Sequence, residues 1–307
     1  MPILLPALTY NYEGGGYDRT TRRHRFDGLQ NTLERAPKPP AVILFCEAKH
    51  YEASGNAGLY QAAEAVTDVF GVPFGALLGR GDRGPIPPAI FYDTSRLIPR
   101  SFIDRSDPGP FTDQINICRF AVLDSHDDTG RRRELIAAVD HFPGESPDAR
   151  VKAASRLHRW AKDPTPVILG GDLNEQPSGD HYPRWESDLC TPLVRRRKAR
   201  RVGDRWVHSS DALDSLVGTW NSTTGGRDDN IGFHLISELA WQASNRITAI
   251  EATVVDKPGE VPLTIDHLIV NDVMRPHVDA ETFRTLPAAC GQEEASDHIA
   301  VYAELSF

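Results

Sequence analysis

The stretch Ile168 to Pro177, ILGGDLNEQP, says most about how this chain folds. An apolar run that begins at Pro166 ends in a pair of glycines, and Asp172 and Asn174 follow directly. A short apolar run bounded by turn residues predicts a strand that is buried on both faces. Polar residues just after such a strand are typical of open α/β sheets, which carry their sites at strand ends. The stretch therefore predicts an α/β fold with a site at the end of this strand.

Further segments place polar residues beside apolar runs in the same way. They are TYNYE with Asn11, LFCEAK with Glu47, AAVDHFP with His141, TIDHLIVN with Asp266, and SDHIAVY with Asp297 and His298. Taken singly, each of these residues fits an ordinary loop, turn or surface position. Taken together, carboxylates, amides and imidazoles form a set that can hold a hard cation and a phosphate group.

The rest of the chain alternates between strand and helix patterns. Strands are expected at 4–10, 41–46, 89–92, 115–123, 135–142, 166–169, 247–255, 264–270 and 299–305, and helices at 22–35, 56–70 and 147–162. This interleaving predicts one layered α/β domain over residues 1–307 with mixed sheets. An irregular insertion, rich in basic and aromatic residues, is expected at about 178–245.

Composition excludes several classes of protein. With 307 residues and 40% hydrophobic residues, the chain has ample material for a core, and disorder is excluded. No apolar run reaches about 18 residues, so no membrane span is expected. The net charge of −9 disfavours a protein that coats nucleic acid by charge alone. Four cysteines without CxxC spacing indicate neither a disulfide framework nor a zinc site, and a cytoplasmic location is expected.

In this order, the polar segments resemble the endonuclease/exonuclease/phosphatase superfamily, which includes pancreatic-type deoxyribonuclease, bacterial neutral sphingomyelinase and inositol-polyphosphate 5-phosphatases. The similarity runs from about Thr9 to Tyr302, and GGDLN with a later SDH is its most specific part. It implies a two-layer mixed β-sandwich flanked by helices, with the four-layer α/β/β/α order of deoxyribonuclease. It also implies metal-dependent hydrolysis of phosphate esters.

The resemblance assigns a metal end to the site. Asn11 and Glu47 match the family's metal-end residues, with Glu47 as the principal Mg²⁺ ligand. Mg²⁺ takes oxygen ligands and keeps several waters, which suits one or two carboxylates and an amide. Glu47, Asp297 and Asn11 supply such groups, and Mn²⁺ is expected to substitute for Mg²⁺.

The resemblance also assigns the groups that face the substrate. Asp172 and Asn174 match the pair that orients the attacking water and holds a phosphate oxygen. Asp266 matches the carboxylate that partners the final histidine, His298. Such a carboxylate raises the pKa of the imidazole and fixes its tautomer, so that a cationic ring faces the phosphate. His141 offers a second ring, and its segment resembles the deoxyribonuclease and sphingomyelinase branches more than the abasic-site repair enzymes.

The chain departs from the deoxyribonuclease pattern at two places. Lys49 stands where deoxyribonucleases carry Arg, which keeps the charge but loses the bidentate fork. The Glu that partners the histidine strand in that branch has no counterpart in GRGDRGPIPPAIFYD, where Asp82 is the nearest substitute. Lys49, Arg83 and Asn174 are the predicted substrate-binding residues.

The insertion bears on the substrate. It carries the basic run VRRRKARRV and four of the five tryptophans, Trp185, Trp206, Trp220 and Trp241. Cations interleaved with aromatic rings suit phosphate tracking and base stacking. A solvated arm whose tryptophans fill a small satellite core explains the same composition, and the two interpretations stand about equal.

The favoured function is therefore a Mg²⁺-dependent phosphodiesterase or nuclease acting on nucleic acid or a nucleotide by in-line attack of water. A phosphatase or phosphodiesterase for a small metabolite or lipid headgroup is the alternative, which the acidic composition favours. A binding module that kept the fold and lost catalysis is less well supported, because every core position holds a competent residue type. A phosphate-ester substrate is the only partner inferred, and no obligate protein partner is expected.

Overall fold

Two six-stranded sheets form the centre of the structure, a computed structural model that describes residues 3–79, 86–104, 114–247, 249–288 and 295–307. The first sheet has the order β17 (Val278–Leu286), β18 (Ala300–Leu305), β1 (Ala7–Asn11), β4 (Val42–Cys46), β6 (Ala89–Asp93) and β5 (Phe74–Leu78). The second has the order β15 (Phe233–Leu235), β16 (Asp266–Asn271), β10 (Val167–Asp172), β9 (Arg132–His141), β8 (Gln114–His126) and β7 (Leu97–Asp104).

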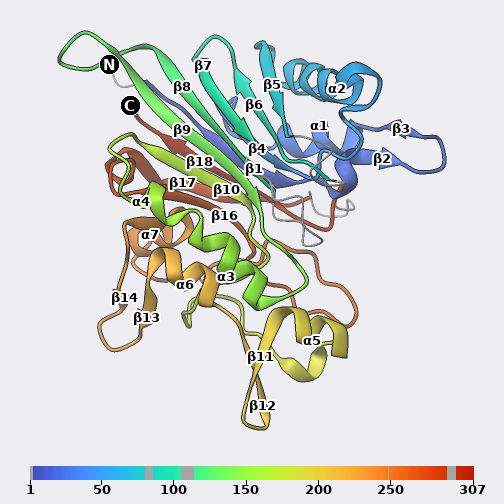
Figure 1. The fold of residues 1–307 in the computed structure, drawn as a ribbon, viewed down its shortest axis with the longest axis vertical. Helices are drawn as coiled ribbons and strands as arrows, with labels where there is room; N and C mark the ends of the chain where they lie inside the picture. Colours follow the sequence, from blue (N-terminus) through green and yellow to red (C-terminus); the bar gives the residue numbers. More distant parts are fainter. Residues whose placement is uncertain (1–2, 80–85, 105–113, 248, 289–294) are drawn as a thin grey trace.

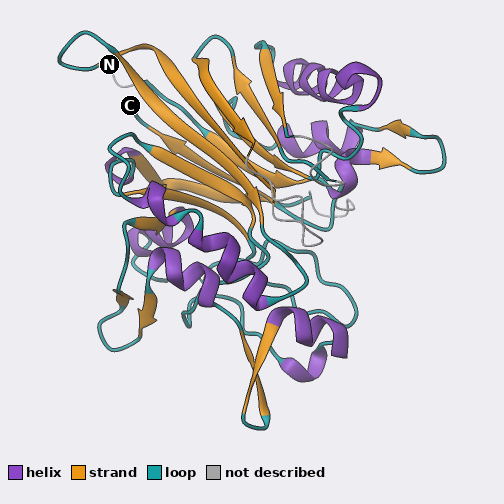
Figure 2. Cartoon of the chain, viewed as in Figure 1, coloured by secondary structure: helices purple, strands orange, loops and turns teal. Residues whose placement is uncertain are grey.

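Helices cover the outer face of each sheet (Figure 2). Helices α1 (Asp27–Leu33) and α2 (Ala53–Phe70) pack on the first sheet. Helices α3 (Pro147–Ser155), α4 (His158–Ala161) and α6 (Asp211–Val217) pack on the second, and α7 (Ile236–Ala243) lies against β16 and β17. The order of layers is α/β/β/α, which confirms the predicted fold class.

The alternation of side chains along β4 shows how the layers form. Val42, Leu44 and Cys46 lie in the core between the two sheets, whereas Ile43 and Phe45 lie in the core under α1 and α2. Every residue of the strand is buried. A strand with helices on one face and a second sheet on the other has no solvated side, so all its residues are apolar.

Strand pairing brings the predicted site segments to one edge of the sandwich. β1 and β4 are parallel, with Asn11 opposite Cys46, and β10 is antiparallel to β16, with Asp172 opposite Asp266. β9 is parallel to β10 and therefore ends in His141 at the same edge. β18 is antiparallel to β1, which places its beginning, next to His298, beside the end of β1.

The second glycine of the GGD motif is required where β9 and β10 lie together. Gly171 has φ +146°, and a Cβ there would stand 1.8 Å from the Asp140 carbonyl oxygen. We expect Gly171→Ala to destabilise the protein by about 3 kcal/mol or more, measured by urea unfolding, because a main-chain atom cannot move aside as a side chain can. Gly130→Ala is the matched control, since Gly130 also has positive φ (+77°) but no atom within 4 Å of the Cβ position. A similar loss in both variants would contradict the role of close packing.

Several predicted elements differ from the structure. The strand expected at 247–255 is wrong: its described residues form a single bridge, Val254 to His298. Thr253 uses its Oγ1 to accept the N–H groups of Ile265 and Asp266, so this extended segment supports the site instead of joining a sheet. The helix expected at 22–35 is confined to α1, since Arg23–His24 form β3 against β2 (Tyr17–Asp18).

The insertion is more ordered than its sequence predicts. It contains α5 (Pro192–Lys198), the ribbon of β11 (Ala199–Val202) and β12 (Arg205–His208), and the ribbon of β13 (Thr219–Asn221) and β14 (Gly226–Asp228). Its last part supplies β15 and α7, which belong to the sandwich itself. Figure 1 shows α5 and the β11–β12 ribbon projecting from one end of the molecule.

The tryptophans of the insertion include a packed pair. Trp220 and Trp241 both contact the buried His181 ring, at 4.4 and 4.1 Å between ring centroids, and lie 5.7 Å from each other. Glu238 Oε1 contacts His181 Nε2 (2.9 Å) and accepts from Arg227 Nη2 (2.5 Å). For these two of the four tryptophans, the structure agrees with the satellite-core interpretation.

Candidate active site

The side chain of Asn11 links the two halves of the site. Its Nδ2 donates to Glu47 Oε1 (3.3 Å) and to Asp172 Oδ2 (3.1 Å). These residues come from the ends of β1, β4 and β10, so one amide joins the first sheet to the second. The two amide hydrogens are thereby used, and the contact from Nδ2 to His298 Nε2 (3.4 Å) is not a further donation.

Two imidazole rings face the same carboxylate oxygen. His141 Nε2 lies 3.4 Å and His298 Nε2 3.7 Å from Asp172 Oδ2. The other oxygen, Asp172 Oδ1, accepts the Asn174 main-chain N–H (2.9 Å), which fixes the carboxylate plane. Asp172 is only 3% exposed and His298 8%. The site is therefore more enclosed than the position of these residues at strand ends suggests.

His298 and Asp266 form the carboxylate–imidazole pair that the sequence predicted, with 2.8 Å between Nδ1 and Oδ2. Burial alone would lower the pKa of His298, but the carboxylates of Asp266 and Asp172 outweigh it and raise the pKa to about 10. Burial opposes a cationic His141 as well, yet Asp172 raises its pKa above the ordinary value. Burial would raise the pKa of Asp172, and the two rings instead hold it below its usual range. The charges of the site therefore favour a protonated His298 and an ionised Asp172, and they shift His141 towards its protonated form.

The donors at the Glu47 end fit a hard cation. Asn11 Oδ1 is buried and has no hydrogen-bond partner among the described residues, so it is an oxygen ligand in need of a positive group. Glu47 is half-buried and has positive φ (64°), and its Oε2 accepts the Gly14 N–H (2.8 Å). The Asp297 side chain is 28% exposed, and its Oδ1 lies 3.9 Å from His298 Nε2. Carboxylate and amide oxygens next to solvent suit an ion that keeps some of its waters.

A second group of ligand-type atoms lies within the same site. Asp172, Asp266 and His298 each offer an atom within 4.8 Å of the others. However, His298 Nδ1 is bonded to Asp266 Oδ2, and burial of this group leaves little room for water. We therefore propose that a metal ion binds preferentially at the more open Glu47 end of the site.

The three predicted substrate-binding residues have different surroundings, and one of them lies outside the described residues. Asn174, with positive φ (53°), donates from Nδ2 to the Phe142 carbonyl (3.0 Å) beside His141. Lys49 is half-buried in the turn after Glu47, where its N–H donates to the Glu47 carbonyl (2.6 Å). Arg83 lies outside the described residues, as does Asp82, and both stay predictions.

The structure adds residues that the sequence patterns did not select. Ser296 Oγ donates to the Asn11 carbonyl (2.7 Å) and so fastens the SDH segment to the end of β1. Lys257 Nζ donates to Asp297 Oδ2 (2.6 Å). Lys198 Nζ donates to Asn174 Oδ1 (2.9 Å). Ser296 could have been found from its place beside Asp297, whereas nothing in the sequence distinguishes the two lysines from surface cations.

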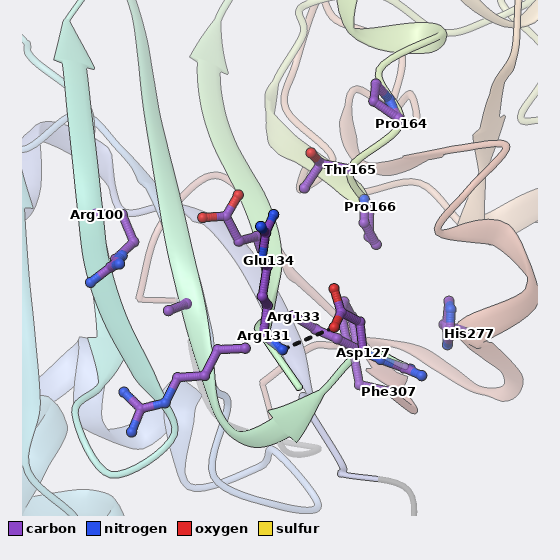
Figure 3. Close-up of a pocket in the computed structure, with 12 residues that line it drawn as sticks. Arg100, Asp127, Arg131, Arg133, Glu134, Pro164, Thr165, Pro166, His277 and Phe307 are labelled. Atoms are coloured by element: carbon purple, nitrogen blue, oxygen red, sulfur yellow. Dashed lines mark hydrogen bonds between the residues drawn. The ribbon is translucent and has the colours of Figure 1, made fainter. Parts of the chain in front are cut away.

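A cavity of about 950 Å³ lies away from this site (Figure 3). The β8–β9 hairpin lines it with Arg131 and Arg133, and His277 and Phe307 lie across from them. The cavity is at the Arg132 end of β9, and His141 is at the other end of this 10-residue strand. At about 3.3 Å per residue the two ends are about 30 Å apart, so the cavity does not share the site's chemistry.

Comparison with known proteins agrees with this fold. The structure of the human Nocturnin catalytic domain with bound sulfate has a TM-score of 0.59 and 12% identity, covering 100% of this chain and 97% of that chain. ANGEL2, a 2′,3′-cyclic phosphatase, has a TM-score of 0.57 and 11% identity, covering 99% and 95%. A mannosyl-6-phosphatase of Bacteroides thetaiotaomicron has a TM-score of 0.55 and 15% identity, covering 99% and 100%. At such identities the likeness concerns the fold alone, and no curated protein sequence matches the chain.

Four α/β/β/α layers with carboxylates and imidazoles at one sheet edge define a phosphoesterase fold. The Endonuclease/Exonuclease/phosphatase family model matches residues 8–298, and the chain belongs to this family. Its members hydrolyse phosphate esters. The resemblance inferred from GGDLN and SDH is confirmed. Among the described residues, no helix has the length and apolar character needed to cross a membrane.

Proposed function

We propose that this protein is a divalent-metal-dependent phosphoesterase, with a phosphodiester as its first candidate substrate. The observation that carries the proposal is the meeting of two imidazole rings at one oxygen of Asp172, next to the oxygen donors of Asn11 and Glu47. Phosphate esters resist attack because their oxygens are negative, so catalysis needs positive groups and a positioned water. The site offers both.

The residues divide this work between them. Asp172 orients the attacking water, since its lowered pKa makes it a stable anion and a weak base. His298, protonated at neutral pH, faces the phosphoryl oxygens with a cationic ring, and Asp266 holds the tautomer and direction of that ring. His141 presents a second ring, whose pKa Asp172 raises towards the protonated form, and one Asn174 amide hydrogen remains for a phosphate oxygen.

Glu47, Asn11 and Asp297 are the residues proposed to hold Mg²⁺, with Mn²⁺ as its substitute. A bound ion would neutralise phosphoryl charge and favour ionisation of the attacking water. The water's oxygen bonds to phosphorus as the ester oxygen leaves on the opposite side, the water's proton passes to Asp172 and from there to solvent or the departing oxygen, and no covalent intermediate forms on the enzyme.

Two observations bear on the class of ester. Contact of His141 with Asp172 supports the deoxyribonuclease-like assignment and hence a diester. The packing of Trp220 and Trp241 around His181 removes two of the aromatic rings that favoured a nucleic acid. A small phosphorylated metabolite is therefore the second candidate, and the Bacteroides mannosyl-6-phosphatase has the same fold.

Hydrolysis of nitrophenyl phosphates tests the proposal. The full chain is expected to release nitrophenolate from bis(p-nitrophenyl) phosphate with Mg²⁺ or Mn²⁺, to lose this activity in EDTA, and to regain it when Mg²⁺ is restored. Faster turnover of p-nitrophenyl phosphate, with plasmid DNA left intact, would favour the metabolite phosphatase. No hydrolysis of either ester, together with no Mg²⁺ or Mn²⁺ binding by calorimetry, would point to a binding module.

A further inference from the structure

The basic residues of the run 195–201 have different surroundings. Most of them bond within the insertion or to α3, or extend into solvent. Arg195 donates to the Ser187 and Cys190 carbonyls, and Arg201 donates to the Gly203 carbonyl. Arg200 pairs with Asp148 and Asp211, and the side chains of Arg196 and Arg197 are exposed. Lys198 is different, because its ammonium contacts a residue of the GGDLN motif. The run therefore contributes to the site through one member.

Lys198 holds the Asn174 side chain from one side. Its Nζ donates to Asn174 Oδ1 (2.9 Å) and to the Asn174 main-chain carbonyl (3.2 Å). On the other side, Asn174 Nδ2 donates to the Phe142 carbonyl (3.0 Å). An ammonium can only donate and a carbonyl can only accept, so the two contacts determine which end of the amide is oxygen. One hydrogen of Nδ2 is left over.

The contact is supported by a buried ion pair. Arg150 is fully buried and donates from Nε to Glu175 Oε2 (2.7 Å) and from Nη1 to the Arg197 carbonyl (3.0 Å). Glu175 follows Asn174 in the chain and Arg197 precedes Lys198, so Arg150 ties together the two segments that carry the contact. The C-terminal end of α5 is thus fixed against the loop after β10.

The charges around Lys198 come from several elements. Asp172 on β10, Glu175 in the next loop and Glu260 before β16 favour the ammonium, whereas burial and Arg150 on α3 disfavour it. Burial is the largest of these effects, and the pKa of Lys198 falls to about 8. His208 on β12 also lies near the ammonium, which together with burial holds the His208 ring neutral at pH 7, with a pKa of about 3.

We propose that Lys198 is a positioning residue of the phosphoesterase site, which fixes the Asn174 carboxamide so that its free Nδ2 hydrogen meets the phosphoryl group. The proposal rests on the function proposed above and adds to it a residue from the insertion. It also gives the basic run a defined role: one member orients a site amide, and its neighbours anchor or solvate the projecting segment.

The variant Lys198→Met tests the proposal, since Met keeps the length of the side chain and removes the donors. We expect kcat for bis(p-nitrophenyl) phosphate to fall on the order of 10²-fold with KM changed less than about threefold, because a misdirected group costs rate more than binding. The melting temperature should stay close to that of the wild type, since removal of a half-buried and partly desolvated cation offsets loss of its hydrogen bonds. Arg196→Met, on the same helix but exposed, is the matched control and should keep wild-type kcat.

The pH profile gives a readout that a purely structural role would not change. As pH rises through about 8, Lys198 loses its proton, so the wild-type rate should fall above this pH. The residual activity of Lys198→Met should lack that fall. Activity of Lys198→Met within threefold of wild type, or an equal loss in Arg196→Met, would overturn the proposal.

The outcome can be separated from failure of the proposed function. If the wild type hydrolyses neither nitrophenyl ester, the function is wrong, and a crystal structure of Lys198→Met decides whether Lys198 positions Asn174. Loss of a defined Asn174 side-chain orientation, or of its contact with the Phe142 carbonyl, would support the positioning role. An Asn174 side chain unmoved from its wild-type position would overturn it.

Discussion

Asp172→Asn is expected to lower kcat on the order of 10³-fold and to leave the protein folded. Asp172 Oδ2 accepts from Asn11 Nδ2 and faces the Nε2 atoms of His141 and His298. An amide there is neutral, so it orients the water less strongly and no longer raises the pKa of either ring. We therefore also expect the pKa values of His141 and His298 to fall, so that both rings lose their protons at a lower pH than in the wild type.

The measurement is a pH–rate profile for bis(p-nitrophenyl) phosphate, with circular dichroism to establish folding. Asp163→Asn is the matched control: Asp163 precedes β10 at its other end, where its Oδ1 accepts the Thr165 N–H (2.8 Å). This control should keep wild-type kcat. If Asp172→Asn keeps more than a tenth of wild-type kcat with an unchanged pH profile, Asp172 has no part in the mechanism.

The loss of stability expected when a site residue is replaced depends on how deeply its side chain is buried. Removal of the whole side chain, as in Asp172→Ala or His298→Ala, would leave an unpaired charge in a site where both side chains are more than nine-tenths buried. Their positions at strand ends predict a solvent-filled cleft and little loss of fold in either alanine variant, whereas the structure buries both side chains, and we therefore expect a loss of stability. The isosteric variant is therefore the informative one.

The sequence predicts the site well because the site is built at strand ends. β4 is apolar throughout and β10 is uncharged up to its last residue, which marks their ends clearly, with Glu47 directly after β4 and Asp172 as the last residue of β10. The pairing of these strands then brings the ends together, since residues opposite each other in neighbouring strands lie about 5 Å apart. The roles of the remaining site residues were predicted from the family resemblance, which rests on the order of these segments along the chain.

Edge strands were harder to predict. β7 and β17 lie at sheet edges, consist mostly of exposed and half-buried residues, and carry charged side chains such as Arg100 and Glu281. Their hydrophobic patterns resemble those of loops, because an edge strand is covered by fewer neighbouring elements and therefore needs fewer apolar residues. Neither strand was expected from the sequence.

The role of Lys198 could not be predicted from the sequence, for a different reason. It stands in a run of similar cations, and only the direction of α5 and the Arg150–Glu175 pair decide which member faces Asn174. That choice depends on how two segments pack, and no local spacing records it. A residue selected by tertiary packing has to be found in the structure.

Glu47→Gln is expected to remove most of the stabilisation that Mg²⁺ or Mn²⁺ gives to the folded protein. An ion present at 100 times its dissociation constant stabilises a protein by about 2.7 kcal/mol, so the wild type should melt several degrees higher with metal than in EDTA. Gln can still accept the Gly14 N–H, which Glu47 Oε2 accepts at 2.8 Å, and loses the longer bond from Asn11 Nδ2 (3.3 Å), so the metal-free melting temperature should fall only slightly. Glu52→Gln, an exposed residue nearby, is the matched control and should keep the full metal-dependent shift.

The same measurement distinguishes the two possible metal positions. If the ion binds at the Glu47 end, Glu47→Gln loses the shift while Asp266→Asn keeps most of it, because Asp266 Oδ2 is bonded to His298 Nδ1. If Asp266→Asn loses the shift and Glu47→Gln keeps it, the ion lies among Asp172, Asp266 and His298. In that case His298 is a ligand and cannot present a cationic ring to the phosphate. The metal ion and His141 would then supply the positive charge that faces the phosphoryl oxygens.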